Sequence, residues 1–177
     1  DEFLADVRAL PQKNIAVQLL ERLLKGKVKS VQRMNVVQAK KYSEMLKNSI
    51  DKYNKRSIQT SKVIEELIEI AKEMRKAAER GEDLGLSQDE VAFYDALADH
   101  MTAKEVLGDE TLRAIAHELT KVIKENMTID WNRKESARAK MRITVRRLLR
   151  EYGYPPDLAK MAVETVVRQA ELMAGNS

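Results

Sequence analysis

A long stretch without helix breakers constrains the fold of this chain more than any other feature. Residues 36–80 contain neither glycine nor proline. Apolar residues recur there at spacings of three and four, the period of one helix face, except between residues 54 and 61, where Ile58 is the only apolar side chain. One helix of this length would run about 67 Å at ~1.5 Å per residue. The pattern predicts either one long helix with a kink near 54–61 or two successive helices.

The remaining segments also favour helices. Six glycines and three prolines in 177 residues leave few sites for tight turns, and sustained period-two alternation is missing. An apolar stripe over residues 15–24 predicts a core helix that stops at Gly26, followed by a basic connector, and residues 81–85 (GEDLG) predict a loop. Ser87 and Glu90 have the spacing of a capping box. We therefore expect an all-α fold, an irregular bundle of about six to eight helices.

Composition limits the classes of protein and the compartment. The chain lacks cysteine, which excludes disulfides and thiol chemistry and fits a reducing cytoplasm. No apolar run approaches the roughly 20 residues of a membrane span, so a membrane partner is not expected. Residues 1–10 resemble the tail end of a preceding element, because Pro11 suits the start of a new helix. The sequence thus predicts one helical domain over residues 11–175.

Charge is distributed in three blocks. Residues 25–56 carry ten basic and two acidic side chains, residues 65–99 carry four basic and eleven acidic ones, and residues 133–150 carry eight basic and one acidic. Two interpretations stay open. The acidic block compensates a basic block within the fold, or a basic block stays free for nucleic acid or for an acidic protein surface.

The third block lies on a predicted amphipathic helix. Asn132 and Glu135 are spaced as a capping box, and Gly153 with the following prolines ends the helix. Its apolar face is predicted to contain Ala137, Met141, Val145, Leu148 and Tyr152. Trp131, the only tryptophan, and Tyr154 are expected to anchor the core.

The basic side of this helix is the strongest functional signal. Four arginines follow one another at four-residue steps, and two further cations lie round the helix. Arginine makes bidentate contacts with phosphates and with carboxylates, so DNA and an acidic protein surface are both suitable partners. The candidate binding residues are Arg138, Lys140, Arg142, Arg146, Arg147 and Arg150.

Signals for catalysis are weak. His100 and His117 lack the spacing of a metal motif, and residues 81–85 lack the lysine and serine or threonine of a P-loop. No serine lies in the context of a nucleophile elbow. We expect no catalytic, cofactor-binding or metal-binding residue in these 177 residues.

Four segments taken together resemble the C-terminal helical region of the R subunit of type I restriction enzymes. In chain order these are LPQKNIAVQLLERLL, NVVQAKKYSEMLKNSIDKYNKRSIQTSKVIEELIEIAKEM, LGLSQDEVAFYDAL and TIDWNRKESARAKMRITVRRLLREYGYPP. The resemblance runs from about residue 10 to residue 173. Its most distinctive pieces are IDW at residues 129–131 and YGYPP at residues 152–156.

The resemblance implies a cytoplasmic module that attaches the motor and nuclease subunit to the modification and specificity subunits. The nuclease domain and the helicase lobes of that family belong upstream and have no counterpart here, so no catalytic residue carries over. ATP and Mg²⁺ are expected for those upstream domains, and the parent is expected to be an ATP-dependent endonuclease. The alternative role is a module that binds the backbone of double-stranded DNA without sequence preference.

Overall fold

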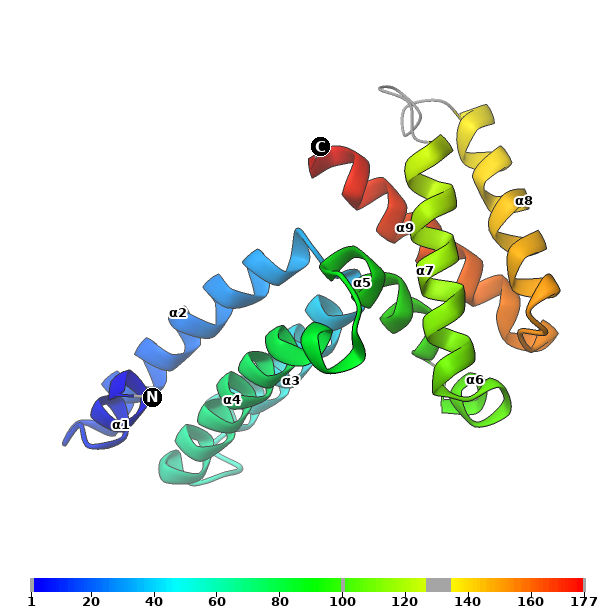
Figure 1. Ribbon diagram of the computed structural model, residues 1–177. Coiled ribbons are helices and arrows are strands. Elements are labelled where there is room, and N and C mark those ends of the chain that lie inside the picture. The colour runs from blue at the N-terminus through cyan, green and yellow to red at the C-terminus, as the bar shows by residue number, and fades with distance from the viewer. Residues whose placement is uncertain (1, 100, 127–134, 177) are drawn as a thin grey trace. The chain divides into compact units, whose positions relative to one another are not determined.

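The structure is a computed structural model that describes residues 2–99, 101–126 and 135–176 (Figure 1). Nine helices and no strand lie in these ranges, which confirms the all-α class. The count exceeds the expected six to eight because two short segments form helices of seven residues each. The helices are α1 (Glu2–Arg8), α2 (Lys13–Gln32), α3 (Val36–Asn54), α4 (Thr60–Leu84), α5 (Gln88–Ala98), α6 (Met101–Leu107), α7 (Asp109–Asn126), α8 (Glu135–Glu151) and α9 (Pro156–Asn176).

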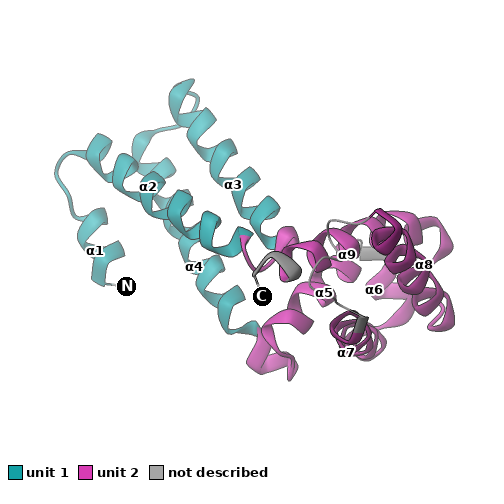
Figure 2. Ribbon diagram, turned by 90° about the horizontal axis from the view of Figure 1, so that it is seen from above, with its two compact units in different colours: residues 1–32, 38–80 teal, residues 33–37, 81–177 magenta. Residues whose placement is uncertain are grey.

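The chain divides into two compact units, each with its own apolar core (Figure 2). Unit 1 consists of residues 1–32 and 38–80, and unit 2 of residues 33–37 and 81–177. Unit 1 includes residues 1–10, and Val7 is buried in its core; the predicted domain boundary after residue 10 stays a prediction. No helix in the described ranges is long and apolar enough to cross a membrane.

Unit 1 is built on α2, α3 and α4, and its core corrects the prediction for α2. The helix continues through Gly26 to Gln32. A glycine inside a helix costs about 1 kcal/mol relative to alanine, but Val28 and Val31 beyond it pack on the core and offset that cost. The buried face is also rotated from the predicted stripe: Ala16, Val17, Leu20 and Leu24 are buried, whereas Ile15 and Leu19 are exposed.

The long stretch forms two helices rather than one. It breaks at residues 55–59, within the segment that has a single apolar residue. Arg56 adopts a positive φ of 53° there, and the Ser57 N–H reaches back to the Lys52 carbonyl oxygen at 3.1 Å, which ends α3 in a left-handed turn.

The predicted loop at residues 81–85 is wrong, because α4 continues to Leu84. Gly81 is helical, and a Cβ on it would lie 3.1 Å from the Leu86 carbonyl oxygen. The helix instead ends at Gly85, whose φ is +68°, and the Leu86 N–H bonds to the Gly81 carbonyl oxygen at 3.0 Å. A glycine at this left-handed position is the usual helix stop.

Unit 2 packs around α5, which is buried along most of its length. Phe93 and Leu97 are fully buried, together with Leu112, Ile115, Leu119 and Ile123 from α7. The predicted capping box of α5 is confirmed: the Glu90 N–H donates to the Ser87 hydroxyl oxygen, and the Ser87 N–H donates to the Glu90 carboxylate.

Residues 33–37 comprise the connector between α2 and α3 and the first two residues of α3, and a polar cluster joins them to unit 2. The Asn35 side-chain amide donates to Asp95 at 2.7 Å. The Gln169 side chain accepts from the Val36 N–H at 3.0 Å and donates to the Met34 carbonyl oxygen at 2.8 Å. Gln169 is only 1% exposed, and its replacement by an apolar residue would remove these two partners from partly buried backbone groups, a cost of up to about 1–3 kcal/mol.

Candidate interaction surface on α8

The antiparallel hairpin of α8 and α9 in unit 2 presents the predicted basic helix (Figure 1). Gly153 ends α8 with a φ of +75°, and the Tyr154 N–H bonds back to the Leu149 carbonyl oxygen at 2.9 Å. Tyr154 is buried as predicted, and its hydroxyl donates to the Leu97 carbonyl oxygen at 2.7 Å. Burial raises the pKa of Tyr154 to about 12, and the charge of Asp99 adds to the rise. The tyrosine therefore stays a neutral donor that ties the end of α8 to α5.

The apolar face of α8 sets which side chains point outward. Met141, Val145 and Leu149 are buried, at the four-residue steps of one helix face. Tyr152 was predicted on this face, but it follows the end of the helix and is 37% exposed. Leu149 takes its place in the core. The predicted cap at Asn132 and the predicted core anchor Trp131 lie outside the described residues.

Two of the six predicted binding residues are engaged within the hairpin. Arg138 lies 3.3 Å from the Glu171 carboxylate. The Arg142 guanidinium donates from two nitrogens to Glu164, at 2.9 and 3.5 Å. Both acids lie on α9. These two pairs therefore do not join α8 to the acidic block of residues 65–99, as one of the two interpretations proposed. Arg138 and Arg142 mainly join α8 to α9.

Acids in the block of residues 65–99 have other partners. Glu65 pairs with Arg8, Glu66 with Lys52, and Asp89 with Lys124. Further pairs stay within α4 or join α5 to α7. Acids of this block therefore form ion pairs within both units, and none of these pairs involves α8.

The other four cations of α8 surround an exposed apolar side chain. Lys140, Arg146, Arg147 and Arg150 are exposed and form no ion pair within the described residues. Ile143 is 65% exposed, and it lies three residues from two of these cations, four from the third and seven from the fourth, the spacings of neighbours on a helix surface. We call Lys140, Ile143, Arg146, Arg147 and Arg150 the arginine face.

Ile143 was missing from the residues predicted from the sequence. The signal was present, because Ile143 lies two residues from both Met141 and Val145 and so falls off the apolar face. Its central position among the cations without ion pairs depends on the pairing of Arg138 and Arg142 with α9, which the sequence pattern does not show.

Two carboxylates in unit 2 have lowered pKa values, and both lie near the ends of helices. For Glu90, burial alone would raise the pKa, but hydrogen bonds from the Ser87 backbone and side chain and from His117 outweigh it and lower the pKa below 4.5. For Asp109, hydrogen bonds from Tyr94 and Arg113 lower the pKa below 3.8 against the opposing effect of burial. Both groups are structural, since they join α5 to α7 or begin α7.

Metal binding finds no support in the described ranges, where no three His, Asp or Glu side chains converge. His117 contacts Glu90 at the surface, and His100 lies outside the described residues. The arginine face has an exposed apolar centre and a basic rim.

Comparisons with known proteins identify the relatives of this chain. Residues 1–176 match the family model for the C-terminal region of type I restriction enzyme HindI endonuclease subunit-like proteins. The chain is 36% identical over 174 residues to the type I restriction enzyme HindI endonuclease subunit of Haemophilus influenzae, covering 98% of this chain and 16% of the relative. It is 34% identical over 157 residues to a putative type I restriction enzyme MjaIXP endonuclease subunit of Methanocaldococcus jannaschii, covering 86% of this chain and 15% of the relative. No solved structure matches the chain.

Proposed function

Because the chain belongs to the family of C-terminal regions of type I restriction enzyme endonuclease subunits, we propose that it docks the DNA-translocating and DNA-cleaving subunit onto a methyltransferase and specificity core. The chain spans 16% and 15% of the length of the two relatives. In this proposal, endonuclease activity with its ATP and Mg²⁺ belongs to the remainder of the subunit. The present chain supplies attachment.

The observation that carries the proposal is the exposed Ile143 among four cations that form no ion pair within the described residues. Binding energy at protein interfaces concentrates in a few central residues that become fully desolvated, while the surrounding residues exclude water. An apolar centre with an arginine-rich rim matches a partner that offers an apolar pocket edged by carboxylates. Arginine is enriched at such interfaces, since its planar guanidinium pairs with carboxylates through two hydrogen bonds.

The alternative function is binding of the DNA backbone through the same helix. The observation in its favour is the set of exposed guanidinium groups on Arg146, Arg147 and Arg150, which form no ion pair in the part of the chain that the structure describes. Phosphate contacts make no use of an isoleucine at the centre of the face, because positioning on DNA depends on charge and hydrogen bonds to phosphate oxygens. Ile143 therefore favours the protein partner and provides the means to separate the two functions.

The test measures binding of the 177-residue chain to purified modification and specificity subunits by isothermal titration calorimetry. Ile143→Ala is expected to weaken binding about 30-fold, the effect of losing about 2 kcal/mol at an interface centre. Val106→Ala on α6 is the matched control, since Val106 is also β-branched, lies in unit 2 and is 63% exposed. The control is expected to bind within about twofold of the original chain.

Three results would count against docking through this face: no binding of the original chain at micromolar concentration, equal losses for the two alanine variants, or no loss for either. Circular dichroism of both variants checks the fold. An exposed position makes unfolding an unexpected outcome, because surface substitutions change stability by about 0.5 kcal/mol or less.

A further inference from the structure

We propose that a second basic surface, on α2 and α3 of unit 1, binds the phosphate backbone of double-stranded DNA. The surface consists of Lys25 and Lys29 on α2 and Lys40 and Lys47 on α3, and we call it the lysine face. It is distinct from the arginine face. The choice of DNA among phosphate polymers rests on the function proposed above, whereas the site rests on geometry and charge alone.

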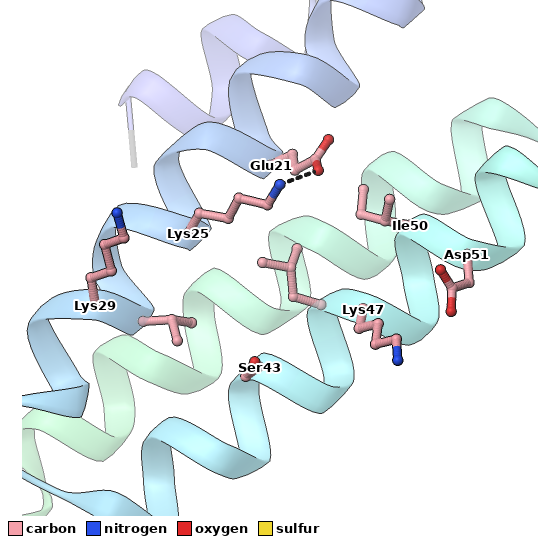
Figure 3. Close-up of a pocket in the computed structure, with 9 residues that line it drawn as sticks. Glu21, Lys25, Lys29, Ser43, Lys47, Ile50 and Asp51 are labelled. Carbon is pink, nitrogen blue, oxygen red and sulfur yellow. Dashed lines mark ion pairs between the residues drawn. The ribbon is translucent and has the colours of Figure 1, made fainter.

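Three of these lysines border one groove. Lys25 and Lys29 lie on α2, and Lys47 comes from α3 on the other side (Figure 3). The groove has a volume of about 400 Å³. Lys40 precedes Lys47 by seven residues, two helical turns, and therefore extends the row on the same side of α3. The lysine face thus has cations along two neighbouring helices.

The positive charge of this region is partly compensated: Glu21 and Asp51 line the same groove, and Glu44 lies between Lys40 and Lys47 at the spacing of neighbours on a helix surface. Residues 25–56 contain ten basic and two acidic side chains. Lys29, Lys40 and Lys47 are exposed and form no ion pair within the described part of the chain. Lys25 contacts Glu21 at 2.8 Å, but that pair is a surface contact one helical turn apart, worth about 0.3–0.5 kcal/mol. A phosphate could replace Glu21 at small cost.

The lysine face lacks the apolar centre that marks the arginine face. Val28, Leu46 and Ile50 form the groove floor, but Leu46 is buried and the other two are half-buried against the core of unit 1. No large apolar side chain is exposed in residues 20–32 and 38–56, all of which the structure describes. A surface of lysine ammonium groups without an exposed apolar anchor favours a polyanion bound through charge.

Lysine is also suited to such a contact. Its ammonium is a compact charge on a flexible stem, which accommodates phosphates at variable positions, whereas arginine favours fixed bidentate geometry. Binding through phosphates alone carries no base information. The lysine face is therefore expected to hold duplex DNA of any sequence, with an affinity that falls steeply as salt displaces it.

The test titrates a fluorescent 30-base-pair duplex with the 177-residue chain at several salt concentrations and follows fluorescence anisotropy. Lys29→Gln with Lys47→Gln is expected to weaken binding about tenfold at low salt and to lower the slope of log K against log salt by about 2, one unit for each lost phosphate contact. Lys62→Gln with Lys76→Gln on α4 is the matched control. Both are exposed lysines of unit 1 outside the lysine face, so this variant removes the same charge and should leave binding within about twofold.

Four outcomes would overturn the proposal: no duplex binding at low salt, unchanged binding of the lysine variant, equal losses in the two variants, or tighter binding of poly-L-glutamate than of DNA. The last would assign the lysine face to an acidic protein. Because this measurement contains no modification or specificity subunit, a failure here leaves docking through the arginine face standing, and a failure of docking leaves the lysine face standing.

Discussion

The two basic surfaces of this chain each carry four cations, on different frameworks. The arginine face lies on one helix of unit 2 and has an exposed isoleucine at its centre. The lysine face lies on two helices of unit 1 and has its apolar side chains turned into the groove floor and the core. Net charge alone would give both surfaces the same partner. The placement of apolar side chains among the charges separates them.

The difference shows how a basic sequence block should be interpreted. On α8, Arg138 and Arg142 are used within the fold, and what remains is a small rim around Ile143. On α2 and α3, most cations face solvent. A desolvated apolar centre gives specificity for one shaped protein surface, whereas dispersed ammonium groups give attraction to any chain of phosphates.

The largest predicted effect comes from removing the apolar centre while adding charge. Ile143→Lys makes the arginine face resemble the lysine face. Binding to modification and specificity subunits, measured by calorimetry, should weaken at least 30-fold, since about 2 kcal/mol or more is lost when a central apolar contact becomes a buried charge. If charge alone decided partner choice, the extra cation would keep or strengthen binding to an acidic partner, and the distinction between the two faces would fail.

How much of this could be predicted from the sequence depends on the kind of feature. Features that depend on local chemistry within a few residues were predictable. These are the all-α class, the α5 capping box, the helix break near residue 56 and the end of α8 at Gly153. The family was also predictable, from the amino-acid sequences of four segments and their order in the chain.

The errors arose where distant contacts override local signals. Gly26 and Gly81 both signal a helix end, yet both lie inside helices, because residues beyond them pack on a core or on the following turn. The arginine face required knowledge of which acids lie beside α8. Glu164 and Glu171 are 22 and 33 positions away from their arginines in the sequence, and no local pattern shows that α9 packs antiparallel to α8.

The second prediction tests whether low pH destabilises unit 2, which contains the arginine face. The pKa of Glu90 is lowered in the folded chain from its ordinary value of 4.5, so its contribution to stability is complete above about pH 4.5 and is lost as pH falls through the folded value. Glu90→Gln should reduce stability at pH 7 by about 1 kcal/mol, the typical loss for a cap. It should also flatten the decline in stability between pH 5 and pH 3.

Hydrogen exchange of α5 amides, corrected for the intrinsic pH dependence of exchange, measures this effect. Glu125→Gln is the control, since Glu125 is an exposed acid of α7 with no ion pair in the described residues. Asp109 retains its own lowered pKa in both variants, so part of the acid sensitivity should remain. Equal pH profiles of stability for the two variants would show that the capping-box carboxylate of Glu90 does not contribute to the pH dependence of the stability of unit 2.

The smallest predicted effect separates arginines that support α8 from arginines that bind. A double-mutant cycle with Arg142→Ala and Glu164→Ala should give a coupling energy of about 0.5 kcal/mol in urea unfolding, the range of surface ion pairs, because both side chains are partly exposed. Neither variant should weaken docking more than about twofold, since the pair lies beside the arginine face and not within it. A docking loss for Arg142→Ala as large as that for Ile143→Ala would show that the whole arginine ridge binds the partner. The apolar centre would then no longer explain why the two basic surfaces differ.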